Sequence, residues 1–180
     1  LKETLLSGQA TPTMVTDLVW KGTDSFSNYE RSEAAAYADG KSLLIDLNTD
    51  ASVSVNTAMQ PSVLYAMPTK GQRVTLSGTG NFTGDMDLWK SQQGTLVADI
   101  PLDYTGTTYI SEGTLEVNGE IKGDVNLRAR GTLSGKAIVN AISFEGALNY
   151  EGCRLMPTEQ MTFKQGLKLD RKVYMEMDLQ

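Results

Sequence analysis

Residues 94–119, which read GTLVADIPLDYTGTTYISEGTLEVNG, contain the repeated element that decides the fold. The tripeptide Gly-Thr-Leu occurs at Gly94-Thr95-Leu96, again at Gly113-Thr114-Leu115, and a third time at Gly131-Thr132-Leu133. A looser copy follows at Gly146-Ala147-Leu148, so that the successive steps are 19, 18 and 15 residues. Repeats of this length are too short for a propeller blade or a helical repeat, but they match one coil of a β-solenoid.

A second series of short apolar triplets recurs in phase with the first, at steps of 16, 17 and 19 residues. Its members are Tyr109-Ile110-Ser111, Val125-Asn126-Leu127, Ile142-Ser143-Phe144 and Met161-Thr162-Phe163. Because like residues return once per coil, equivalent leucines are expected to form one interior column, made of Leu96, Leu115, Leu133 and Leu148. The sequence therefore predicts an all-β, right-handed parallel β-helix. At roughly 18 residues per coil, residues 37–180 would make about eight coils.

An antiparallel β-sandwich is the alternative architecture, because it also consists of many short strands separated by turns. Hairpins of a sandwich need alternating apolar and polar residues, but they do not need the same triplet to return at a fixed spacing. The repeats therefore favour the β-helix.

The first 36 residues differ from the rest, since they contain turn-rich stretches such as Thr11-Pro12-Thr13 and Gly22-Thr23-Asp24. The open end of a solenoid exposes apolar core and unpaired backbone groups, and some cap is physically required there. We therefore expect an N-terminal lead-in or cap over residues 1–36. A β-helix is expected over residues 37–180, with its repeat core at 94–119.

Composition limits the chemistry that these 180 residues can perform. The net charge of −6 argues against nucleic acid or an anionic membrane as a partner. The chain has no histidine and a single cysteine, Cys153, which excludes a Ser-His-Asp site, a histidine metal cage and an internal disulfide. No apolar run approaches the ~20 residues of a transmembrane segment. Leu1 is not an initiator residue, so we expect the chain to be a piece of something longer.

Residues 94–119 resemble the autotransporter-associated β-strand repeat of bacterial passenger domains. That repeat has a Gly-Thr-Leu strand, then Tyr-x-Gly-x-Thr, matched from Tyr104 to Thr108, and then Gly-Thr-Leu-x-Val-Asn-Gly. Residues 76–90 are similar to the lead-in that often precedes it. The chain departs from the pattern at Asp103, where the family often has Asn, and no second full copy follows. The resemblance implies a passenger-type β-helix of a Gram-negative secreted or surface protein, with an extracellular or outer-surface location.

Acidic pairs are candidates for a site of chemistry, because some β-helix proteins cleave polysaccharides. Asp85 and Asp87 flank Met86 and would point to the same side of a strand. Such a pair could hold Ca²⁺ or act as an acid and a base, but any solvated strand face has the same pattern. We therefore predict no catalytic, metal or cofactor-binding residues.

Aromatic side chains are the remaining candidates for a binding site, because sugar rings stack on exposed aromatic faces. The candidate carbohydrate contacts are Trp20, Tyr29 and Trp89. A sugar platform would need several coplanar rings on one solvent face. For Trp20 and Phe26 we favour the alternative, in which both rings fill the end of the core.

The lack of histidine chemistry favours a non-enzymatic structural role, as a stalk or scaffold segment of a larger secreted or surface protein. Its partners would be the neighbouring domains of the same polypeptide. The alternative is a carbohydrate-binding or adhesive module, attached to a larger enzyme or adhesin, with surface glycans as partners. A carboxylate-based glycanase or lyase ranks third.

Overall fold

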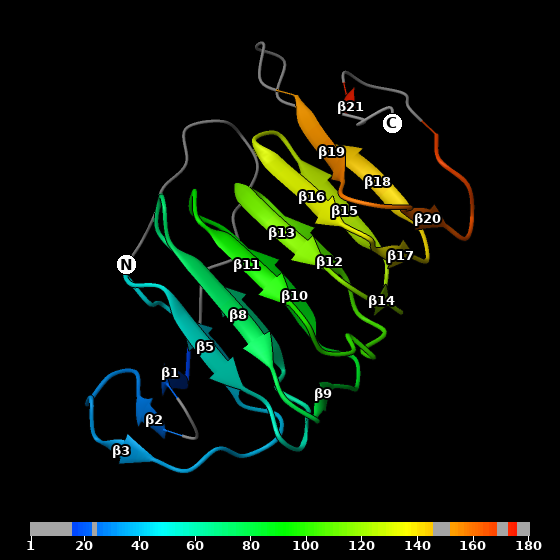
Figure 1. The fold of residues 1–180 in the computed structure, drawn as a ribbon. Coiled ribbons are helices and arrows are strands. Elements are labelled where there is room, and N and C mark those ends of the chain that lie inside the picture. Colours follow the sequence, from blue (N-terminus) through cyan, green and yellow to red (C-terminus); the bar gives the residue numbers. More distant parts are fainter. Residues whose placement is uncertain (1–15, 23–24, 146–151, 169–172, 176–180) are drawn as a thin grey trace.

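A computed structural model describes residues 16–22, 25–145, 152–168 and 173–175. Its described residues are all β, and parallel strands stack into a β-solenoid of about seven turns (Figure 1). This confirms the parallel β-helix over the antiparallel sandwich, with about seven turns where the sequence predicted about eight.

Each coil contributes strands to three faces. Sheet A contains, in spatial order, β18 (Ile142–Glu145), β15 (Val125–Arg128), β12 (Thr108–Ile110), β10 (Asp87–Lys90), β7 (Val63–Ala66), β4 (Ser42–Ile45), β1 (Leu18–Gly22), β2 (Ser25–Asn28) and β3 (Ala34–Ala35). Sheet B contains β21 (Val173–Met175), β19 (Cys153–Pro157), β16 (Gly131–Gly135), β13 (Gly113–Val117), β11 (Thr95–Ala98), β8 (Arg73–Ser77) and β5 (Ala51–Ser54).

The third face, sheet C, is made of two-residue strands. One group contains β14 (Glu120–Ile121), β17 (Ile138–Val139) and β20 (Thr162–Phe163), and the other contains β6 (Ala58–Met59) and β9 (Asn81–Phe82). Leu102 bridges the two groups, since it pairs with Phe82 on one side and with Ile121 on the other. Short strands at this face let the chain turn sharply from sheet B back to sheet A.

The predicted leucine column exists for three of its four members. Leu96 pairs in parallel with Leu115, and Leu115 pairs with Leu133, with all three side chains completely buried. The fourth member was wrong, because Leu133 pairs with Leu155, and Leu148 lies outside the described residues. The step from Leu133 to Leu155 is 22 residues, so this coil is longer than the Gly-Ala-Leu spacing suggested.

The second predicted series behaves similarly. Ile110, Leu127 and Phe144 pair in register on sheet A. The last triplet does not continue this column, because Phe163 pairs with Val139 on sheet C. Both errors occur in the last coils, where the corners between the faces differ in length from those earlier in the chain.

The N-terminal strands both continue and close sheet A. β1 pairs in parallel with β4, so the stack already begins before residue 37, whereas β2 pairs antiparallel with β1 and with β3. Trp20 is buried, and its ring centroid lies 5.0 Å from that of Phe26, which lies 5.6 Å from that of Tyr37. These rings cover the apolar end of the interior, as favoured for Trp20 and Phe26.

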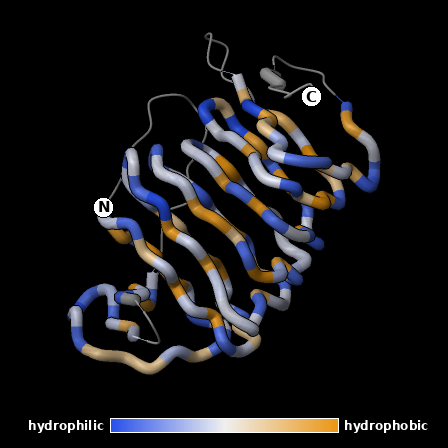
Figure 2. The backbone as a smooth tube through the Cα atoms, viewed as in Figure 1, coloured by the Kyte–Doolittle hydropathy of each residue, from blue (hydrophilic) through white to orange (hydrophobic). Residues whose placement is uncertain are grey.

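The interior is one continuous apolar column along the stack. Apolar and polar residues alternate along the coils (Figure 2). The buried apolar residues from all three faces pack in a single cluster. Corners come close enough to restrict residue choice: a Cβ placed on Gly123 would lie 1.9 Å from the carbonyl oxygen of Gly106 in the preceding coil. Glycine is therefore required by backbone contact at this corner.

We expect Leu115→Ala to lower the free energy of unfolding by about 2–5 kcal/mol, because it leaves a cavity in the middle of the column. Thr114→Ala, at the partly exposed neighbouring position, should change it by less than about 1 kcal/mol. Urea unfolding of both variants measures the difference. Equal effects of the two substitutions would contradict the assignment of Leu115 to the interior.

Candidate functional site: an aromatic and arginine cluster on sheet A

The outer face of sheet A presents aromatic side chains from successive coils. Along β10, Leu88 and Lys90 are buried in the interior while Trp89 is partly exposed. The register places Tyr65, Trp89 and Tyr109 side by side on β7, β10 and β12. The ring centroids of Trp89 and Tyr109 lie 4.0 Å apart with their planes inclined by 20°, so the two rings are stacked.

Arg128 completes this arrangement from β15. Its guanidinium carbon lies 5.0 Å from the Trp89 centroid and 5.1 Å from the Tyr109 centroid, so that the cation interacts with both rings. We call Trp89, Tyr109 and Arg128 the aromatic–arginine cluster. Cation–π contact at a partly exposed site contributes about 0.5–1 kcal/mol, which helps to order the long side chain.

Polar side chains of β15 and β18 fix the orientation of the guanidinium group of Arg128. Nε of Arg128 donates to Oδ1 of Asn126 at 3.0 Å and lies 3.2 Å from Oε2 of Glu145. The amide nitrogen of Asn126 in turn donates to Ser143 Oγ and to Glu145 Oε1. The Nη1 and Nη2 groups of Arg128 make no hydrogen bond within the described part of the chain.

The structure separates the three predicted carbohydrate contacts. Trp20 is only 1% exposed, so its prediction as a sugar contact is wrong: its ring belongs to the interior. Tyr29 lies in the turn after β2 and is partly exposed, with four strands between β2 and β12 in the order of sheet A. Trp89 alone belongs to the aromatic–arginine cluster.

Sequence reasoning missed Tyr109 and Arg128 as members of this site. The signal was present, because Leu88-Trp89-Lys90 and Thr108-Tyr109-Ile110 are 20 residues apart, close to one coil. Aligning these two triplets would have placed both rings on one face. Arg128 carries no such signal, because its side chain reaches back over the two preceding coils.

The acidic pair at the start of β10 has a structural role for one of its members. Oδ1 of Asp87 accepts a hydrogen bond from the backbone N–H of Thr107 at 2.7 Å and ties the corner to the next coil. Asp85 is exposed in the preceding turn. Within the described ranges, no group of three or more acidic, cysteine or histidine side chains could hold a metal ion.

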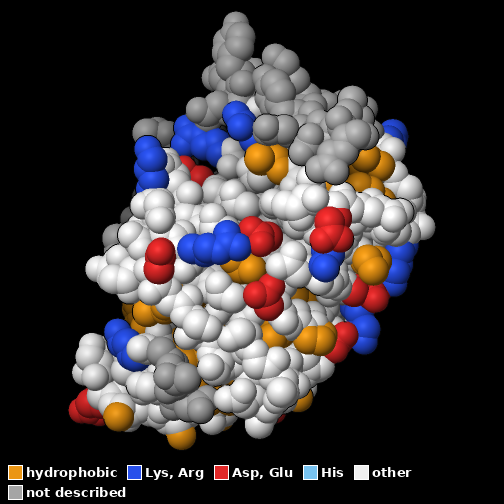
Figure 3. Space-filling view, viewed as in Figure 1, with side chains coloured by type: hydrophobic (Ala, Val, Ile, Leu, Met, Phe, Trp, Pro, Cys, Tyr) orange, Lys and Arg blue, Asp and Glu red, His pale blue; other side chains and the backbone are white. Residues whose placement is uncertain are grey.

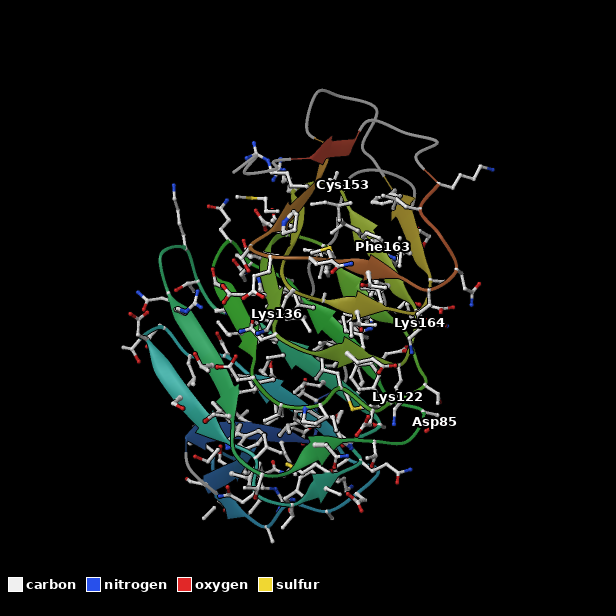
Figure 4. All side chains as sticks on the ribbon, turned by 45° about the vertical axis from the view of Figure 1, so that its right-hand side comes forward. Asp85, Lys122, Lys136, Cys153, Phe163 and Lys164 are labelled. Atoms are coloured by element: carbon white, nitrogen blue, oxygen red, sulfur yellow. The ribbon has the colours of Figure 1, made fainter. Side chains whose placement is uncertain are left out.

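Several charged residues elsewhere on the surface are paired with opposite charges. On the sheet C side, Lys122 lies 2.8 Å from Asp103 and lowers the pKa of that carboxyl group by hydrogen bonding. Lys164 pairs with Glu120, and Lys136 with Glu159, so each of the three lysines labelled in Figure 4 has an acidic partner. The face shown in Figure 3 also intersperses both signs of charge, which indicates a solvated surface rather than an electrostatic binding patch.

Lys90 is an unusual member of the interior, because its side chain is completely buried. Its ammonium group donates to the backbone carbonyl oxygens of Ser91, Gln92 and Glu112 at 2.9, 2.7 and 2.9 Å. Burial lowers the pKa of Lys90 to about 7, and the nearby Glu112 carboxylate opposes this shift. The side chain therefore links the corner after β10 to the corresponding corner of the next coil.

No family model, curated protein or solved structure matches the chain. Among the described residues, no helix is long and apolar enough to cross a membrane.

Substitution of Lys90 by Met should lower the free energy of unfolding by about 2–4 kcal/mol, because it removes the donor to three partly buried carbonyl groups. Lys122→Met removes an exposed ammonium group and should have a much smaller effect. Thermal and urea unfolding compare the two variants. If Lys90→Met were as stable as the wild type, the carbonyl contacts would not be holding these corners together.

Proposed function

We propose that this chain is a non-enzymatic structural segment, a stalk or scaffold within a larger bacterial secreted or cell-surface protein. The observation that carries the proposal is the continuous apolar interior through about seven turns. Side chains stack from coil to coil and backbone hydrogen bonds join neighbouring coils, which makes a stiff body without requiring any reactive group. The resemblance of residues 94–119 to passenger-domain repeats supports the same role.

A scaffold of this kind should tolerate removal of a whole coil. Because Val63 pairs with Asp87, excision of residues 63–86 joins the chain in register and places β10 beside β4. We expect the shortened protein to unfold cooperatively, and we expect neighbouring domains of the parent protein to keep their activity. Circular dichroism, urea unfolding and assays of the parent protein measure these outcomes.

Excision of residues 63–72 is the control. It removes fewer residues, but it deletes β7 and leaves β8, so sheet A loses a strand in that coil and the interior is opened. This variant should fail to fold although it is the smaller change. Loss of a neighbouring domain's activity in a well-folded 63–86 deletion would argue that the removed coil does more than hold its neighbours apart.

A carbohydrate-binding or adhesive module is the second candidate. The specific observation in its favour is the row of Tyr65, Trp89 and Tyr109 on one outer face, because a sugar platform needs several rings on a single face. Because the Trp89 and Tyr109 rings stack on each other, each ring covers part of the face of the other. A ligand would therefore contact the outward edges of the rings and the part of their surface that remains exposed.

Glycan-array binding tests this candidate. Wild-type protein should bind a subset of glycans, and Trp89→Ala should abolish the signal because it removes the centre of the row. Tyr29→Ala, which alters a partly exposed aromatic residue distant in the order of sheet A, should leave binding intact. A blank array for the wild type across diverse glycans would remove the carbohydrate-binding candidate while leaving the scaffold role in place.

A further inference from the structure

Arg128 has an incomplete set of partners for a guanidinium group in its position. One edge is occupied, because Nε faces Asn126 and Glu145. The side chain is only 26% exposed, and its contact with both aromatic rings restricts it to one orientation. The Nη1 and Nη2 groups make no hydrogen bond within the described residues, so a fixed pair of donors remains available.

We propose that the aromatic–arginine cluster is a binding site for an acidic saccharide, whose carboxylate pairs with the Nη groups of Arg128. This inference rests on the carbohydrate-binding candidate and specifies its ligand class. A planar guanidinium group recognises a carboxylate through two parallel N–H···O bonds, which a neutral sugar cannot accept in the same way. The adjoining Trp89 and Tyr109 rings offer apolar surface to the C–H groups of the pyranose ring that bears the carboxylate.

Glu145 determines from which side the ligand approaches. Its carboxylate lies beside Nε and repels a second carboxylate on that edge, so the ligand must approach the edge that carries the Nη groups. The hydrogen bonds from Asn126 to Ser143 and Glu145 hold this acidic side chain in place. A guanidinium group that is already held in place loses little conformational freedom on binding, which favours binding of the sugar residue that bears the carboxylate.

An acidic peptide is the competing ligand, since Trp, Tyr and Arg are also the residues enriched in protein interfaces. Such interfaces place these residues in well-packed pockets, whereas Trp89 and Tyr109 form part of a row that repeats along the open face of a sheet. A polymer of sugar units laid along that row meets the same kind of surface in successive coils. We therefore favour the saccharide and make the peptide an arm of the test.

The experiment titrates the protein with tri-galacturonate, with the neutral trisaccharide maltotriose and with tri-glutamate, at matched ionic strength. Tryptophan fluorescence is the readout, because Trp89 is partly exposed and the only other tryptophan, Trp20, is buried. We expect saturable quenching by tri-galacturonate alone. Arg128→Lys, which keeps the charge but loses the paired donors, should weaken binding at least tenfold, and Arg128→Met should abolish it.

Arg73→Met is the matched control, because it removes the same charge from sheet B, where Arg73 pairs with Glu116. It should bind tri-galacturonate as the wild type does, and melting curves establish that every variant is folded. Equal binding of maltotriose would overturn the acidic-saccharide site but leave the carbohydrate-binding candidate standing. Equal binding of tri-glutamate would show a general carboxylate site and overturn the saccharide assignment. If no saccharide binds, either in this titration or on the glycan array, both the acidic-saccharide site and the carbohydrate-binding candidate are ruled out.

Discussion

Each inward side chain of this protein must lie over a side chain of the coil before it, one strand spacing away, and the remaining features follow from that requirement. It keeps Leu96, Leu115 and Leu133 in one column, although the lengths of the corners between them differ. It brings backbone so close at the Gly106 and Gly123 corner that a Cβ is excluded. It also aligns outward residues, so that Trp89 and Tyr109 meet without any dedicated loop to position them.

The fold was accessible from sequence where the coil length stays nearly constant. The Gly-Thr-Leu triplets of the central coils are 19 and 18 residues apart, and each triplet occupies the same place in the coil. The repeat spacing misassigns Leu148 and Phe163, since spacing alone cannot tell a new coil from a longer corner. To find the next member of the column from sequence, one would have to know which apolar residue packs over Leu133 in the following coil.

The candidate site was only partly accessible. Composition identified Trp89 as a ring that could be exposed, but the same reasoning selected Trp20, which the first turn of the stack encloses. Lys90 illustrates the opposite case, because no pattern marks a charged residue as interior until the backbone carbonyls around it are known. Function is harder still to infer, because a scaffold constrains shape and leaves the identity of most outward side chains open.

The antiparallel strands β2 and β3 give this stack a consequence for self-association. A second copy could extend a sheet by pairing with a long, regular edge strand, but in sheet A the position beyond β1 is already taken by β2, which in turn pairs with β3. In the described part of the chain the outermost strand there, β3, is only two residues long, too short to template an incoming chain. Growth of a fibre from this end of sheet A is therefore opposed by the shortness of the edge strand, with no need for charge repulsion.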